Sequence, residues 1–188
     1  MKRIMITLVS LLSVNAVNAQ IPTGTEWDEM ARTDYKLLPK YGHIEKNANQ
    51  KKSDEKYINE VMQLDQFKGD KTAASNHMIG LGFNYYYRGD LKTAMYRFNQ
   101  AYLLDSLNTD IYWGYGAIYM VLGEYEKAKE QYGEGLKQNP RNSRLLTDLA
   151  TYFMAQYYGL EPLDKKMANV HLDSAISYLH QSYAIDQE

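Results

Sequence analysis

Two stretches of this chain align with each other at an offset of 34 residues. When 76–105 is laid on 110–139, small residues coincide with small residues and rings with rings, in the pairs Gly82/Gly116, Tyr85/Tyr119, Gly89/Gly123, Ala94/Ala128, Phe98/Tyr132 and Ala101/Gly135. A period of this length is typical of helix–turn–helix repeats, in which small side chains let paired helices touch. Such repeats stack into extended surfaces, so the period predicts a protein that binds rather than one that catalyses.

The period divides most of the chain into three helix pairs. They span about 75–108, 109–142 and 143–188, and a Gly-Asp or Gly-Glu dipeptide separates the two helices in each of the first two. Pro140 follows the second helix of the second pair, where a proline cannot continue the helix. The pattern therefore predicts an all-α fold for this part of the chain.

The third pair contains an insertion. Its second-helix alanine, Ala175, lies 47 residues after Ala128, which is 13 more than the period of 34. Pro162 stands where that alanine is expected. We therefore expect about 13 inserted residues near 157–171, followed by a long helix that Asp164 caps.

These residues resemble the tetratricopeptide repeat family, whose pattern is a Leu-Gly-x-x-Tyr core, a turn glycine, Ala-x-x-x-Phe-x-x-Ala and a closing proline. The first two copies read Leu81-Gly82-x-x-Tyr85, Gly89, Ala94, Phe98 and Ala101, and then Tyr115-Gly116-x-x-Tyr119, Gly123, Ala128, Tyr132, Gly135 and Pro140. The third keeps Leu149-Ala150-x-x-Phe153 and Ala175-x-x-x-Leu179-x-x-Ser182. The resemblance covers about 75–188 and implies a right-handed superhelical stack of antiparallel helix pairs, an α–α solenoid.

In this family the first helices line a concave groove that binds a protein or peptide. The resemblance therefore implies such a partner, and the groove positions here are Asn76, Ile79, Phe83, Tyr86, Asp110, Trp113, Met120, Arg144, Thr147 and Met154. Aromatic anchors with an arginine are typical of binding hot spots. Some members grip a peptide carboxylate with Lys, Asn and Arg, but Ile79 and Phe83 occupy two such positions here, and only Arg144 suits that role.

Residues 20–74 precede the repeats and lack their pattern. The segment 20–50 holds two prolines, two glycines and no apolar period. We therefore expect an N-terminal arm of mostly coil, with a short helix near 27–35. A packing helix then follows, capped by Ser53 and ended by Gly69.

The arm carries too many apolar side chains to be left in water, namely Trp27, Tyr35, Leu37, Leu38 and Tyr41. It can lie elsewhere on the repeats and leave the groove open. It can also fill the groove, which would make Phe83 and Trp113 part of the core. A flexible leader is the third alternative.

Residues 1–19 have the features of a secretory signal peptide. Lys2 and Arg3 precede an apolar run over 4–14, and Val17-Asn18-Ala19 provides a small-residue cleavage site. The run is shorter than the roughly 20 residues that span a bilayer, which argues against a membrane anchor. We expect cleavage after Ala19, which leaves 169 of the 188 residues.

Composition limits where the protein can be located and which classes of partner it can bind. The chain has no cysteine, which excludes disulfides, thiolate metal sites, a cysteine nucleophile and the acylation of bacterial lipoproteins. Without the two basic residues of the signal, 19 Lys and Arg stand against 23 Asp and Glu, a net charge of −4. This mild charge argues against nucleic acid or an anionic membrane as partner. We expect a soluble, unlipidated periplasmic or otherwise exported protein, with no membrane insertion after cleavage.

No constellation of residues predicts catalysis, a metal or a cofactor. His171 and His180 lie nine residues apart, on opposite sides of one helix, so they cannot chelate a metal together. Gly80-Leu81-Gly82 opens a dinucleotide motif, but Tyr85 holds the position of its third glycine. We therefore predict that the protein is not an enzyme.

We interpret the chain as an exported adaptor that binds a protein or peptide in the cell envelope. The alternative is a glycan-binding protein whose aromatic helical groove stacks on sugar rings, although envelope proteins of that kind are larger and usually lipid-anchored. Two further alternatives are an enzyme site built by the arm and the 157–171 insertion, and a structural subunit of an envelope complex.

The last helix raises a question about oligomeric state. A repeat array usually ends with a polar-faced helix, because its last repeat cannot cover its own apolar side. Here the apolar residues of the last helix lack such a cover: Ile176, Leu179, Tyr183 and Ile185. Either the arm or a second molecule covers them, so a homodimer through this helix is a hypothesis.

Overall fold

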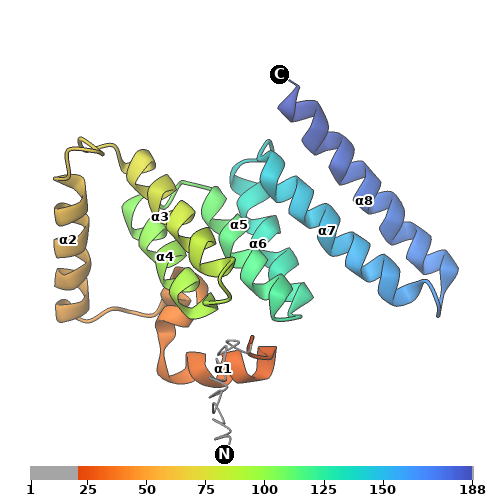
Figure 1. Cartoon of the computed structure of the whole chain (residues 1–188), viewed down its shortest axis with the longest axis horizontal. Coiled ribbons are helices and arrows are strands. Elements are labelled where there is room, and N and C mark those ends of the chain that lie inside the picture. The colour runs from red at the N-terminus through yellow and green to blue at the C-terminus, as the bar shows by residue number, and fades with distance from the viewer. Residues whose placement is uncertain (1–20, 188) are drawn as a thin grey trace, which may run out of the picture.

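The computed structural model describes residues 21–187, and the predicted signal peptide therefore lies outside the described residues. Within this range the chain forms eight α-helices, two 3₁₀ helices and no strand (Figure 1). The elements are α1 Gly24–Thr33, η1 Tyr35–Leu37, η2 Pro39–His43, α2 Ala48–Met62, α3 Lys71–Tyr86, α4 Leu91–Leu104, α5 Asp110–Val121, α6 Tyr125–Gln138, α7 Ser143–Leu160 and α8 Lys165–Asp186.

Helices α3 to α8 stack as three pairs. Each helix packs most extensively on its partner in the pair, α3 on α4, α5 on α6 and α7 on α8. The second helix of a pair also contacts the first helix of the next, and the first helices contact one another. Figure 1 shows α8 at one end of the stack and α2 beside its other end. This is the all-α solenoid that the repeat pattern predicts.

Two glycines allow the paired helices to touch. A Cβ atom on Gly116 would lie 2.1 Å from the Tyr132 ring, and one on Gly82 would lie 2.4 Å from the Phe98 ring. Both rings are fully buried, so neither can move aside easily. The two contacts are 34 residues apart, and they are the same contact made in successive repeats.

A pair of asparagines joins the starts of neighbouring first helices. Nδ2 of Asn108 donates to Ser75 Oγ and to Asn76 Oδ1, over 3.0 and 2.8 Å. Nδ2 of Asn142 repeats both bonds 34 positions later, over 2.9 and 2.7 Å. The period is therefore visible in polar contacts as well as in packing.

The helix before the repeats begins earlier than expected, and the prediction that Ser53 caps it was wrong. Asn47 and Gln50 form a reciprocal capping box, in which each side chain accepts from the backbone N–H of the other residue, so α2 starts at Ala48. Ser53 lies inside the helix, and its hydroxyl donates to the Asn49 carbonyl over 3.0 Å.

The first helix of the first repeat also begins before the expected position near 75. Asp70 accepts a hydrogen bond from the Ala73 N–H over 2.9 Å, so α3 starts at Lys71. Ser75 is instead buried inside α3, where its hydroxyl donates to the Ala101 carbonyl of α4 over 3.1 Å. Ser75 therefore joins the two helices of the first pair.

The extra length of the third pair is helical. Helices α7 and α8 have 18 and 22 residues, whereas α4 and α6 have 14 each. Only 161–164 connects α7 to α8. As expected, Asp164 caps α8 by accepting from the Met167 N–H over 3.0 Å. The inserted residues therefore lengthen both helices and do not form a loop.

The arm is more ordered than expected and lies on the second helices. Thr23 and Glu26 form a capping box that starts α1, which explains why the prediction of mostly coil was wrong. Asp28 pairs with Lys127 of α6 over 2.7 Å, and Asn99 of α4 donates to two carbonyls of the 34–38 turn over 2.8 and 2.9 Å. Within the described residues, no hydrogen bond, ion pair or ring contact joins the arm to a predicted groove residue. The hydrogen bonds and the ion pair of the arm therefore lie away from the predicted groove residues.

We predict that Gly116→Ala destabilises the fold by about 1–3 kcal/mol, because the added methyl group meets the buried Tyr132 ring. Gly80→Ala is the matched control, since it lies on an exposed helix position where a Cβ meets nothing within 4 Å. That control should gain about 0.5–1 kcal/mol from its higher helix propensity. Urea unfolding followed by circular dichroism measures both, and equal effects would contradict the close contact.

Candidate functional site: the groove of the first helices

The centre of the groove is a cluster of rings from α3 and α5. The Phe83 and Trp113 rings lie 3.9 Å apart between centroids, and Tyr86 packs edge-on against Phe83 at 5.9 Å. Phe83 is only 8% exposed and also contacts the buried Phe98 ring, so it belongs to the core. Trp113 and Tyr86 are half-buried. The cluster therefore combines one buried ring, Phe83, with two partly accessible rings, Trp113 and Tyr86.

A further tyrosine enlarges the accessible surface. Tyr87 follows the end of α3 and is 75% exposed, with its ring edge-on to Tyr86 at 5.3 Å. Aromatic rings exposed beside one another offer a large apolar surface at a small cost in conformational entropy. This edge of the cluster is the part of the groove that a ligand can reach most easily.

A charged pair closes the other edge of the cluster. The Arg144 guanidinium lies 5.5 Å from the centroid of the Trp113 ring, and its Nη1 is 2.5 Å from Asp110 Oδ2. The Arg144 side chain is 58% exposed, so this ion pair adds little stability by itself. Its main effect is to hold a guanidinium over the indole, where it can also contact a ligand.

Asp148 places a carboxylate beneath the aromatic cluster. Its Oδ2 accepts from Trp113 Nε1 over 3.0 Å and from the Tyr132 hydroxyl over 3.3 Å. Burial raises the pKa of Asp148 above its usual value, and the two hydrogen bonds only partly oppose this shift. Burial, with a contribution from the Asp148 charge, also raises the pKa of Tyr86.

Sequence reasoning did not select Asp148, although the period contains a signal for it. The equivalent contact one repeat earlier is between Phe98 and Gly114. A Cβ atom on Gly114 would lie 2.5 Å from the Phe98 ring. The residues 34 positions later are Tyr132 and Asp148. A tyrosine thus stands in place of the phenylalanine and an aspartate in place of the glycine. The added hydroxyl donates a hydrogen bond to the added carboxylate.

The other predicted groove residues have different surroundings. Ile79 is buried, whereas Met120 and Met154 are half-buried. Asn76 is exposed and accepts from Asn108, and the Thr147 hydroxyl lies 2.8 Å from the Ser182 hydroxyl of α8. The contacts above join only half of the predicted set into one cluster: Phe83, Tyr86, Trp113, Arg144 and Asp110.

Residues 21–187 contain no group of three or more His, Asp or Glu side chains placed to hold a metal ion. No helix in this range combines the length and the apolar character needed to cross a bilayer.

Comparison with known proteins agrees with the fold. Residues 85–151, from the end of α3 into α7, match the tetratricopeptide repeat family. This part of the chain is a tetratricopeptide repeat segment. No curated protein matches the sequence. Repeats of this family generally mediate the binding of protein partners, and their fold is typically a non-catalytic scaffold.

We predict that Asp148→Asn changes how stability depends on pH. Because the folded pKa of Asp148 is raised, the folded state binds the proton more tightly than the unfolded state does. Lowering the pH from 7 towards the unfolded pKa should therefore stabilise the wild type relative to the variant. Urea unfolding of both at pH 7 and about pH 4.5 measures the difference, with Asp173→Asn as an exposed control. A difference that is constant or has the opposite sign would contradict the raised pKa.

Proposed function

We propose that the protein is an exported, non-catalytic adaptor that binds a protein or peptide through the groove of α3, α5 and α7. The observation that carries the proposal is the accessible aromatic edge of a tetratricopeptide repeat groove that lies away from the hydrogen bonds and the ion pair of the arm. The features of a signal peptide at 1–19 support export, and the mass of the protein recovered from the cell envelope tests cleavage after Ala19.

The surroundings of the groove favour a peptide with an apolar or aromatic side chain. Tyr87 and the accessible part of Trp113 can flank such a side chain, as in the buried centre of an interface. Arg144 lies at the rim, where its Asp110 partner already balances its charge. We therefore assign the binding energy to the rings and a lesser, orienting role to the arginine.

To test the site, peptides that bind residues 21–187 are first selected from a displayed library of random sequences. Trp113→Ala should weaken the binding of a selected peptide by about tenfold or more, because it removes one of the two rings that flank the peptide side chain. Tyr125→Ala is the control, since Tyr125 is 41% exposed but lies outside the groove, on α6. Calorimetry measures the affinities, and circular dichroism verifies folding. Failure to select any peptide, or equal effects of the two variants, would reject the groove.

We also propose that the protein forms a homodimer through α8. One face of this helix, Ala168, Ala175 and Ser182, is buried. Beside that face Ile176, Leu179 and Tyr183 are 44%, 46% and 65% exposed. In the first two pairs, the first helix of the next pair packs on the second helix, whereas no described element packs in this way on α8.

The spacing of this stripe favours a second copy as its cover. Leu172, Ile176, Leu179 and Tyr183 follow one another at intervals of four, three and four residues, which read the same in both directions. Two antiparallel copies of α8 can therefore pair Leu172 with Tyr183 and Ile176 with Leu179. The helix has a 3.6-residue period that keeps these positions on one face.

Charges beside the stripe suit the same arrangement. Asp173 and His180 lie on one flank of the stripe. Antiparallel pairing brings Asp173 of each copy close to His180 of the other copy. The same pairing places Lys165 and Lys166 near the Asp186 end of the second helix. The opposite charges of the two lysines and of Asp186 favour this orientation over a parallel one.

Leu179→Glu should convert the dimer to a monomer, because it places two carboxylates near the centre of the antiparallel pair. Ser177→Glu is the control, since Ser177 is exposed on the same helix but points away from the stripe. Light scattering over a range of concentrations measures the mass. A wild-type mass that remains monomeric at every concentration would reject the dimer, and peptide binding in the groove would be unaffected by that result.

A further inference from the structure

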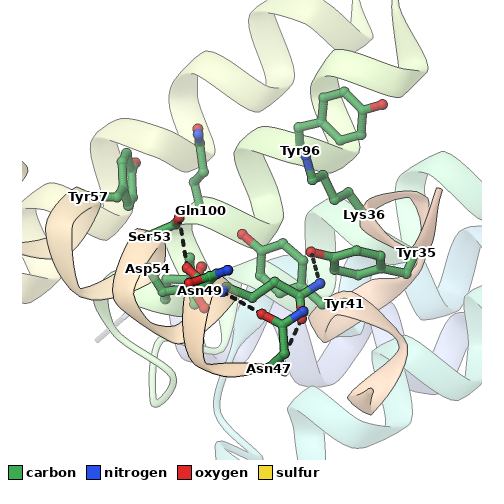
Figure 2. Close-up of a pocket in the computed structure, with 12 residues that line it drawn as sticks. Tyr35, Lys36, Tyr41, Asn47, Asn49, Ser53, Asp54, Tyr57, Tyr96 and Gln100 are labelled. Carbon is green, nitrogen blue, oxygen red and sulfur yellow. Dashed lines mark hydrogen bonds between the residues drawn. The ribbon is translucent and has the colours of Figure 1, made fainter. Parts of the chain in front are cut away.

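A second hollow lies outside the groove, between the arm, α2 and α4. Its volume is about 550 Å³, within the range of roughly 300–1,000 Å³ typical of small-molecule sites. Segments far apart in the sequence form its walls (Figure 2). The lining residues are Tyr35, Lys36, Tyr41, Asn47, Asn49, Gln50, Ser53, Asp54, Tyr57, Tyr96, Gln100 and Leu103.

The walls combine aromatic rings with neutral hydrogen-bonding groups. Four of the twelve lining residues are tyrosines, four are amides, and Leu103 alone has an apolar aliphatic side chain. Lys36 and Asp54 carry opposite formal charges, and Asp54 is already paired with Lys46 over 2.5 Å. The hollow therefore has no net charge among its lining residues and no apolar wall of the kind that fits a lipid.

Several lining groups are held in place by bonds within the protein. Gln50 Nε2 donates to the Tyr35 hydroxyl over 3.1 Å, and the Tyr96 hydroxyl donates to Asp34. Figure 2 shows Tyr35 and Tyr41 together on one wall, with their ring centroids 6.1 Å apart. These contacts fix two rings and one hydroxyl before any ligand arrives, which lowers the entropy lost on binding.

The turn that carries Tyr41 is strained. Lys40, Tyr41 and His43 have φ angles of 53°, 59° and 54°, so three residues with side chains lie in the left-handed region together with Gly42. Such a conformation is disfavoured for residues with a side chain and persists only where surrounding contacts impose it. Here the Lys40 N–H donates to the Tyr115 hydroxyl over 3.1 Å, and Lys46 lies 3.7 Å from the centre of the Tyr41 ring. These two contacts therefore hold the turn and the Tyr41 ring in place as one wall of the hollow.

Other lining groups remain without partners in the described part of the chain. The Tyr57 hydroxyl is sealed from water and makes no hydrogen bond, and burial raises the pKa of Tyr57 to about 12. The Asn49 amide and the Tyr41 hydroxyl form no hydrogen bond within residues 21–187. Gln100 uses its oxygen to accept from Arg97, which leaves its amide nitrogen available. Residues of α2, α4 and the arm therefore bring unpaired donors and acceptors to the lining of the hollow.

We propose that this hollow binds a neutral saccharide. A sugar ring presents C–H faces that pack against tyrosine rings, and its hydroxyls both donate and accept, as the amides of Asn49 and Gln100 do. The formal charges of the lining residues sum to zero, which favours an uncharged sugar over an anionic one. This site shares no residue with the groove, so it is independent of the adaptor function and of the groove-bound glycan considered from the sequence.

Calorimetric titration with maltose and with N,N′-diacetylchitobiose, each at millimolar concentration, tests the proposal on residues 21–187. At least one should bind, and Asn49→Ala and Gln100→Ala should each weaken that binding by about tenfold, the effect of losing one good hydrogen bond. Asn59→Ala is the matched control, because Asn59 is an exposed asparagine on the same helix that does not line the hollow. Circular dichroism verifies that all variants fold.

Hydrogen exchange provides a second readout that does not depend on the variants. The bound sugar should slow exchange of the amides in α2, because this helix supplies Asn49, Gln50, Ser53, Asp54 and Tyr57 to the lining. Binding of neither sugar would overturn the proposal, as would equal effects of Asn49→Ala and Asn59→Ala. Binding that Trp113→Ala abolishes would also overturn it, because the sugar would then occupy the groove.

Discussion

The stack depends on the close approach of paired helices at positions that have no side chain. Gly82 and Gly116 each lie under a buried ring from the partner helix, at distances that a methyl group would violate. This approach brings the rings of Phe98 and Tyr132 to full burial. Because interiors pack to nearly crystalline density, the separation of each pair sets the position of the next. The spacing of the groove rings therefore follows from these two contacts.

The repeated part of the fold could be predicted because one period encodes both helices and their contact. Gly82 and Phe98 recur 34 positions later as Gly116 and Tyr132, and the geometry confirms both pairs. The start of α2 could not be predicted as well, because Ser53 and Asn47 both suit a helix start. The reciprocal bond from Gln50 decides between them, and it depends on a side-chain contact three residues away.

The candidate site was predicted less completely than the fold. Facing positions on the first helices do gather Phe83, Trp113 and Arg144 into one cluster. The resemblance does not tell which rings become core, since this depends on how closely α3 and α5 approach. The arm was still harder to place. Its contacts with α4 use Asn99 and backbone carbonyls, and neither has a periodic signature.

The buried pair of Tyr132 and Asp148 has no counterpart in the preceding repeat, although the two repeats share the same period. Solenoids can gain or lose repeats when one unit can replace another. Loss of 109–142 from this chain would remove both donors to the Asp148 carboxylate, Trp113 and Tyr132, and would bring Phe98 to the position next to it. A buried carboxylate would then face a ring that offers no hydrogen bond. The order of the repeats is therefore fixed by chemistry inside the stack, and the array cannot shorten by one unit without a compensating substitution.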